Sequence, residues 1–428
     1  MHWVPGSAPP CPDGRGGGGA LAQLSPWDPR GFPARAAPGV FLGLATLSQA
    51  GASLSQQGVA VLAVFFRAAL HLTFSQMGTL VSAVSLGMMV GLTVAGVLVD
   101  RIGPRWLLGV GGGWSLLAGF GVSRIHGYGL LLALLFVMGI GLGCIPSAGT
   151  RAVFDAFAGR ARGMVMGIRQ TGVPLGAAVG AVLIPLLVPG WGTGGVFVAI
   201  ALLVLASAWT FGLVIRRRVR ARAPAARLPG IAWLKPALGP MAVGMMLVAA
   251  QYSVLTFTMA DLSTRHGWTV AAAGLGLALV QVGGGAGRIG LGWWSDRRGG
   301  QRSGAIMGAA ALGAAAALAF GWAPPSTPAG VLLAILVPLG IGAVGWNALV
   351  LTWSGERVPA WGAGQAMSWT GSAVFLGSAL YPPAFGWVLD HTGHFSWAFS
   401  ALALWMVLAG ILVVVVRRRD ARSVAAAA

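Results

Sequence analysis

Long apolar segments separated by short polar breaks follow one another along the chain from residue 39 onward. Four of them contain no aspartate, glutamate, lysine or arginine: 39–66, 72–99, 106–123 and 127–150. A helix needs about 20 residues to cross a bilayer, so each segment is long enough for one crossing. The pattern therefore predicts helices that span a membrane.

The rest of the chain continues the same plan. Residues 163–215 contain a single charge, Arg169, and a Gly- and Pro-rich break at 189–194, which predicts two spans. Six more spans are predicted in 236–260, 267–295, 303–355 (two, separated by a break at 323–328), 358–389 and 395–416. We expect a disordered tail at 1–38, six helices in 39–215, a basic linker at 216–235, six helices in 236–416 and a second tail at 417–428.

The composition agrees with a membrane protein, because only 9% of the 428 residues are charged while 56% are hydrophobic. Soluble domains carry about 25% charged residues. The formal net charge of +19 would suit a nucleic-acid partner, but the basic residues lie between apolar segments and share no common face. They fit the positive-inside rule, because 23 of the 28 lysines and arginines lie on one side if both termini are inside. The expected location is the plasma (inner) membrane with both termini in the cytoplasm, and no nucleic-acid partner is expected.

A charged turn occurs twice, once in each half of the chain. Gly96-Val-Leu-Val-Asp100-Arg101-Ile-Gly103 recurs 196 residues later as Gly292-Trp-Trp-Ser-Asp296-Arg297-Arg-Gly299. A second repeat, with an offset of 201 residues, relates Leu175-Gly176 to Leu376-Gly377 and Asp155 to Glu356. Repeats half a chain apart indicate an internal duplication, a plan common among secondary transporters.

The charged turn resembles the cytoplasmic loop signature of the major facilitator superfamily, G-x-x-x-D-R-x-G-R/K-R/K, found between helices 2 and 3 and more weakly between helices 8 and 9. The first copy departs from it at Pro104, and the second departs at Gly300 and Gln301. The resemblance covers residues 39–420. It implies an all-α fold of twelve transmembrane helices in two pseudo-symmetric six-helix bundles, with a cavity between them and transport by alternating access.

The resemblance also implies a set of gating residues at the inner face. Asp100 would face the start of span eleven near 362–365 and stabilise the outward-facing state, and Asp296 would face the start of span five. Arg101 would pair with Asp155, and Arg297 with Glu356. The alternative is that these are solvated loop charges. The full set of candidate gating residues is Asp100, Arg101, Arg105, Asp155, Asp296, Arg297 and Glu356.

Two arginines lie within predicted spans. Arg288 precedes Asp296 by eight residues, so it lies about 12 Å from that end of its helix. A charge inside the membrane is costly, and it indicates function by default. The pattern around Arg288 resembles the eighth helix of oxalate/formate exchangers and monocarboxylate porters, where an arginine meets the substrate carboxylate. The alternative is an arginine whose head group reaches the inner surface.

Polar residues near the middle of spans extend the candidate site. Gln56 in span one corresponds to Tyr252 in span seven through the 196-residue offset. Polar side chains in lipid usually face the interior of the bundle, where they either contact substrate or hold helices together. The candidate substrate-binding residues are Arg288, Arg169, Gln56, Gln251, Tyr252, Asn347, Trp346 and Tyr381.

Two features that are absent from the sequence restrict the possible transport mechanisms. None of the nine acidic residues falls in the middle of a predicted span, so no carboxylate can alternate between a proton and a cationic substrate. No phosphate-binding loop of the form G-x-x-x-x-G-K-[ST] is present, so ATP hydrolysis is not expected. No enzyme activity, cofactor or metal site is expected.

These observations predict a secondary active transporter that moves a small organic anion such as a carboxylate by symport or exchange. A proton or a counter-anion would be the coupled partner, and the protein is expected to act as a monomer in the lipid bilayer. One alternative is an exporter of amphipathic drugs or metabolites, for which Met88, Met89, Met245 and Met246 would form a soft wall. Another is a membrane receptor that retained a transporter fold, although no signalling domain follows residue 420.

Overall fold

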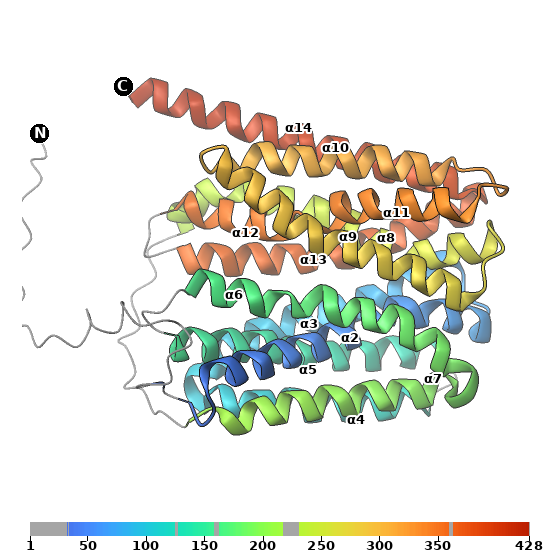
Figure 1. The fold of residues 1–428 in the computed structure, drawn as a ribbon, viewed down its shortest axis with the longest axis horizontal. Helices are drawn as coiled ribbons and strands as arrows, with labels where there is room; N and C mark the ends of the chain where they lie inside the picture. The colour runs from blue at the N-terminus through green and yellow to red at the C-terminus, as the bar shows by residue number, and fades with distance from the viewer. Residues whose placement is uncertain are drawn as a thin grey trace, which may run out of the picture.

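The structure is a computed structural model that describes residues 32, 34–124, 127–157, 162–216, 231–358 and 363–427. Every regular element in these ranges is helical (Figure 1). The first half contains α2 (Pro38–Leu70), α3 (Phe74–Ile102), α4 (Pro104–Val122), α5 (Tyr128–Ala156), α6 (Arg162–Gln170) and α7 (Gly172–Val214). The second half contains the 3-10 helix η1 (Ile231–Ala237), α8 (Leu238–Thr264), α9 (Val270–Arg297), α10 (Arg302–Gly321), α11 (Ala329–Val344), α12 (Asn347–Glu356), α13 (Ala363–Thr392) and α14 (Phe395–Ala427). The expected all-α class is confirmed, and most of the expected N-terminal tail and basic linker lie outside the described residues.

Ten helical segments in the described ranges are long and apolar enough to cross a membrane. The glycine-rich α4, 19 residues long, is not among them. Helices α6 and α7 contribute to a single 50-residue segment, Val165–Val214, although Gly192 interrupts it with φ 67° and ψ 167°. Likewise α11 and α12 form one segment, Ala329–Glu356. The difference between these ten segments and the twelve predicted spans has two sources. The short α4 is not counted, and the two spans predicted in 163–215 are counted as one.

Helices pack against each other both within each half of the chain and between the two halves. In Figure 1, α2 to α7 occupy the lower part of the molecule and α8 to α14 the upper part. Within the first half, α2 packs on α7 and α3 on α5; within the second, α8 packs on α13 and α9 on α11. The halves meet where α3 contacts α13, α7 contacts α9 and α2 contacts α8. These three contacts place the middle of α2, α8 and α9 between the two halves.

Glycines allow the closest helix crossings. A Cβ at Gly176 in α7 would lie 2.0 Å from the carbonyl oxygen of Ala50 in α2. A Cβ at Gly377 in α13 would lie 2.2 Å from the carbonyl oxygen of Met245 in α8. Helices in lipid associate largely through close van der Waals packing, which small residues permit. The repeated Leu-Gly pair thus makes the same backbone contact in each half of the chain.

The charged turns gain their shape from glycine as well. Gly103, with φ 82°, is the single residue between the end of α3 and the start of α4, and Pro104 occupies the first turn of α4. Proline suits that position because its missing N–H would have no partner inside the helix. In the second copy, Gly299 (φ 69°) and Gly300 (φ 77°) connect α9 to α10. The departure from the signature at Pro104 is therefore compatible with a tight helix-to-helix turn.

Replacing Gly176 by alanine tests this packing. Gly176→Ala should lower the midpoint of thermal unfolding in detergent, because the new methyl group forces α2 and α7 apart at a cost of about 1–3 kcal/mol. The matched control is Gly167→Ala in α6, where a Cβ would meet no atom within 4 Å. That control should leave the midpoint unchanged or raise it. Equal midpoints for the two variants would contradict the packing argument.

Candidate functional site

A cluster of polar side chains lies in the middle part of α2, α8 and α9 and at the start of α12. The Nε2 group of Gln56 in α2 donates a hydrogen bond to the Tyr252 hydroxyl in α8, at 2.5 Å. The Nδ2 group of Asn347, at the start of α12, donates to the Oε1 atom of Gln251 at 2.7 Å. Gln56, Gln251 and Tyr252 are all buried. The structure thus brings together Gln56 and Tyr252, which the 196-residue repeat relates to each other.

Arg288 joins this cluster from α9, without a counter-charge. Its guanidinium interacts electrostatically with Tyr252. Its Nε atom is buried and has no hydrogen-bond partner. No carboxylate in the described part of the chain forms an ion pair with it. A half-buried cation therefore lies near the Tyr252 hydroxyl group without an ion-pair partner among the described residues.

Arg169 has a different environment from Arg288, although the sequence predicts both as arginines within membrane spans that could bind substrate. Its side chain is only 1% exposed. Its Nη1 atom donates to Thr150 Oγ1 at 3.1 Å, and its Nη2 atom donates to Gln49 Oε1 at 2.7 Å and to the Pro146 carbonyl at 3.3 Å. Its Nε atom has no partner. Arg169 thus links α6 to α2 and α5, and all of these hydrogen bonds lie within the first half. Arg288 shares none of these partners.

A further polar contact between the halves, from α9 to α2, was not predicted from the sequence. The Nε2 group of Gln281 in α9 donates to Gln57 Oε1 in α2 at 2.6 Å, and Gln57 Nε2 donates to Ser53 Oγ at 2.9 Å. The Oε1 atom of Gln281 is buried without a partner. A signal was available, because Gln281 precedes Arg288 by seven residues and so lies on the same face of α9.

The other two aromatic candidates, Trp346 and Tyr381, lie in packed surroundings. The Trp346 side chain is fully buried at the break between α11 and α12, and its indole N–H donates to the Ala343 carbonyl at 2.8 Å. The Tyr381 ring lies 5.0 Å from the Trp405 ring, between α13 and α14. The structure therefore places Tyr381 against a different set of helices from the cluster around Arg288.

At the end of the bundle that carries the second charged turn, Arg302 is the central residue. Its guanidinium donates to Asp296 at the end of α9 and, through Nη2, to Glu356 Oε1 at the end of α12, at 3.2 Å. The expected pair of Arg297 with Glu356 is not formed. Arg297 instead stacks over the Trp293 ring at 4.0 Å. The reason is geometric: Arg297 ends α9, one turn beyond Trp293, whereas Arg302 begins α10 between the ends of α9 and α12.

The first charged turn is partly described. Asp155 accepts a hydrogen bond from Arg151 Nε at 3.1 Å, one turn earlier in α5. Among the described contacts this partner takes the place of Arg101, which is exposed at the end of α3. The Asp100 side chain and the chain at 359–362 lie outside the described residues, and so does the contact expected between them.

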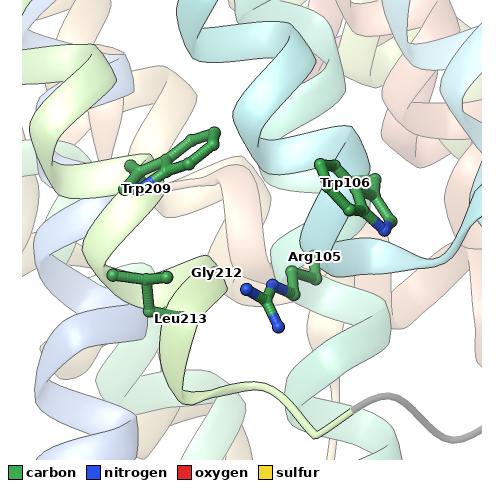
Figure 2. A pocket seen from close by; sticks show the side chains of 5 residues that line it. All are labelled: Arg105, Trp106, Trp209, Gly212 and Leu213. Atoms are coloured by element: carbon green, nitrogen blue, oxygen red, sulfur yellow. The ribbon is translucent and has the colours of Figure 1, made fainter.

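The last gating candidate, Arg105, lies against α7 rather than between the halves. Figure 2 shows Arg105 and Trp106 lining a small pocket together with Trp209, Gly212 and Leu213. Its guanidinium carbon is 5.9 Å from the centre of the Trp106 ring. Arg105 therefore makes its described contacts within the first half.

Comparison with known proteins identifies the family. The profile described as Major Facilitator Superfamily matches residues 45–239 and 241–427. The chain belongs to the major facilitator superfamily. This transporter is therefore a multi-pass integral membrane protein that moves a small molecule across a lipid bilayer, and it is not an enzyme.

Curated relatives of the transporter include proteins with named substrates. It is 31% identical over 354 residues to an uncharacterized MFS-type transporter of Mycobacterium tuberculosis, covering 81% of this chain and 78% of the relative. It is 29% identical over 168 residues to the probable L-galactonate transporter of Escherichia coli, covering 39% and 36% of the two chains. It is 28% identical over 159 residues to the hexuronate transporter of Bacillus subtilis, covering 36% and 37%.

Solved structures support the same fold at low sequence identity. The nucleoside transporter NupG superposes with a TM-score of 0.72 and 13% identity, covering 88% of this chain and 99% of NupG. A bacterial homologue of the human lysosomal transporter Spinster, in an inward-facing and occupied conformation, gives a TM-score of 0.73 and 14% identity, covering 89% and 97%. The transporter therefore shares their helical architecture.

The different environments of the two arginines predict different effects of substitution. Arg169→Gln should lower the thermal unfolding midpoint, because it leaves buried acceptors on α2 and α5 without a donor, at about 1–3 kcal/mol for an unsatisfied group. Arg288→Gln removes no hydrogen bond to any residue in the described ranges, so it should leave the midpoint close to that of the parent. Unfolding of both variants, measured in one detergent, checks this. A larger loss for Arg288→Gln would contradict the structural role of Arg169.

Proposed function

We propose that this transporter carries small organic carboxylates by symport or exchange, with Arg288 binding the substrate anion. The observation that carries the proposal is the unpaired guanidinium of Arg288, beside Tyr252 and away from any ion-pair partner in the described ranges. An unpaired charge in a medium of low dielectric is costly, so an anion that visits the site is stabilised there. A guanidinium also offers a planar fork of donors that matches a carboxylate.

The polar cluster that contains Tyr252 favours a carboxylate that carries hydroxyl groups. Gln56, Gln251 and Asn347 supply both donors and acceptors, and Tyr252 adds a hydroxyl group. Such neutral groups pair well with hydroxyl groups and add no charge. The hexuronate and L-galactonate transporters are named for substrates that are hydroxylated carboxylates. Their similarity to part of this chain supports the same substrate class here.

The proposed architecture is twelve spans in two pseudo-symmetric six-helix bundles, at 39–215 and 236–416, which rock about the cluster around Arg288. Three observations support it. The break at Gly192 divides Val165–Val214 into two lengths that can each cross a bilayer. The 19-residue α4 lies within the range of spanning helices. Gly176 and Gly377 make equivalent contacts in the two halves.

The exporter alternative has less support. Met88, one of the methionines proposed to form a soft wall for amphipathic compounds, is 2% exposed and belongs to the packed core. The charge of Arg288 likewise favours an anion over a cationic drug.

Replacing Arg288 tests the substrate charge. Arg288→Lys should keep the fold and lose at least about tenfold in uptake of labelled carboxylates into proteoliposomes, because lysine keeps the charge but loses the planar fork. The matched control is Arg298→Lys, an exposed residue stacked on Trp294, which should transport like the parent. The uptake panel should contain plain and hydroxylated carboxylates as well as cationic dyes. Parent-like uptake by Arg288→Lys, or transport of cations alone, would favour the exporter.

Cysteine labelling tests the orientation. We expect both termini and the α9–α10 turn to face the cytoplasm, as the positive-inside rule predicts. In a Cys11→Ser background, Thr392→Cys should react with an impermeant maleimide on intact cells, and Gln301→Cys should react only after the membrane is permeabilised. Both positions are exposed, while the native Cys144 is buried. The opposite labelling pattern would reverse the topology.

A further inference from the structure

A carboxylate from the second half of the chain caps a helix of the first half, at the end of the bundle opposite the charged turns. Asp390, near the end of α13, accepts hydrogen bonds from the backbone N–H groups of Phe74 and Ser75, each at 2.8 Å. These are the first two residues of α3, whose N–H groups have no partner within the helix. The backbone N–H of the third residue, Gln76, donates to Thr73 Oγ1 at 3.1 Å. Asp390 therefore completes the cap of α3 from across the interface.

The two helices fit closely below this cap. A Cβ at Gly78 would lie 2.5 Å from the Pro382 carbonyl group, and a Cβ at Gly386 would lie 2.3 Å from the carbonyl oxygen of Phe74. One turn further along α3, the Ser82 hydroxyl donates to the Ala379 carbonyl. Positions 74, 78 and 82 share one face of α3, so the helices run antiparallel and in contact for about 12 Å.

Phe74 itself is fixed by aromatic neighbours from the second half. Its ring lies 5.5 Å from the Phe395 ring and 6.4 Å from the Phe257 ring, and the Phe257 ring stacks on Phe385 at 4.6 Å. The guanidinium of Arg67 covers the other side at 3.9 Å from the ring centre. The start of α3 is thus inserted among α8, α13 and α14, which closes this end of the transporter.

We propose that Asp390 is a gating residue that holds this end of the transporter closed by capping α3 across the interface between the halves. Alternating access requires the halves to separate at each end in turn. On separation, Asp390 loses two charge-assisted hydrogen bonds and α3 keeps only the part of its cap that Thr73 provides, so the closed state gains stability that the open state lacks. The contact lies at an exposed surface, where water can replace both partners. The latch is therefore reversible.

This role is separate from the gating residues predicted by sequence, all of which belong to the opposite end. It also does not depend on which substrate binds. A failed anion proposal would leave the latch intact, and a failed latch would leave the site around Arg288 intact.

Distance measurements on the full-length transporter in lipid nanodiscs test the latch. Spin labels at His71→Cys and His394→Cys, two exposed positions next to the contact, report whether this end is closed or open. Asp390→Ala should raise the ratio of long to short distances about two- to fivefold, the range expected for a carboxylate at a helix N-terminus. Asp390→Asn, which keeps an acceptor oxygen and loses the charge, should give a smaller rise.

The matched control is Gln76→Ala. It removes the bond from the Thr73 nitrogen to Gln76 Oε1, 3.0 Å long, and so weakens the start of α3 without touching α13. It should leave the distance ratio unchanged. An unchanged ratio in Asp390→Ala, or an equal rise in Gln76→Ala, would overturn the proposal. Thermal unfolding close to that of the parent shows that each variant is folded.

Discussion

Lipid offers no hydrogen-bond partners to a polar group, and this constraint governs how the helices meet. Backbone groups are satisfied inside the helices, so the helices themselves can approach until a glycine touches a carbonyl oxygen, as Gly176 does at Ala50. Polar side chains must then find each other across helices. Gln56 pairs with Tyr252, and Gln57 pairs with Gln281, in both cases across the two halves of the chain.

The same constraint gives opposite meanings to two arginines. Arg169 obeys it, because donors on its guanidinium reach acceptors on α2 and α5 and hold three helices together. Arg288 breaks it, because among the described residues none of its guanidinium nitrogens makes a hydrogen bond and no ion pair compensates its charge, although its Nε atom is buried. A buried charge without hydrogen bonds or an ion pair would destabilise the fold if its role were only structural. At the proposed transport site, the same arrangement leaves guanidinium donors free to bind an anionic substrate.

Sequence alone predicted what depends on length, repetition and apolar composition. The all-α class and the charged turns at Gly103 and Gly299 follow from such patterns. The 196-residue offset relates Gln56 to Tyr252, but it did not predict the hydrogen bond between them. It did not predict which arginine meets Glu356, because the path of the chain after Gly299 and Gly300 decides whether Arg297 or Arg302 reaches it. It also could not distinguish Arg169 from Arg288, since the partners of Arg169 lie on helices distant in sequence. The role of Asp390 could not be predicted from the sequence, because its partners are backbone N–H groups, which no particular residue type reveals.

The contact of Asp390 with the start of α3 has a consequence for how the transporter tolerates sequence change. Every residue except proline carries a backbone N–H, so positions 74 and 75 can accept many side chains without losing the hydrogen bonds to Asp390. Proline at position 74 would suit the first turn of the helix and still remove a donor. The opposite side of the contact depends on one carboxylate of one length. On the side of α13, the two hydrogen bonds therefore depend on the side chain at one position. On the side of α3, they require only a backbone N–H, and packing alone restricts the side chain at position 74.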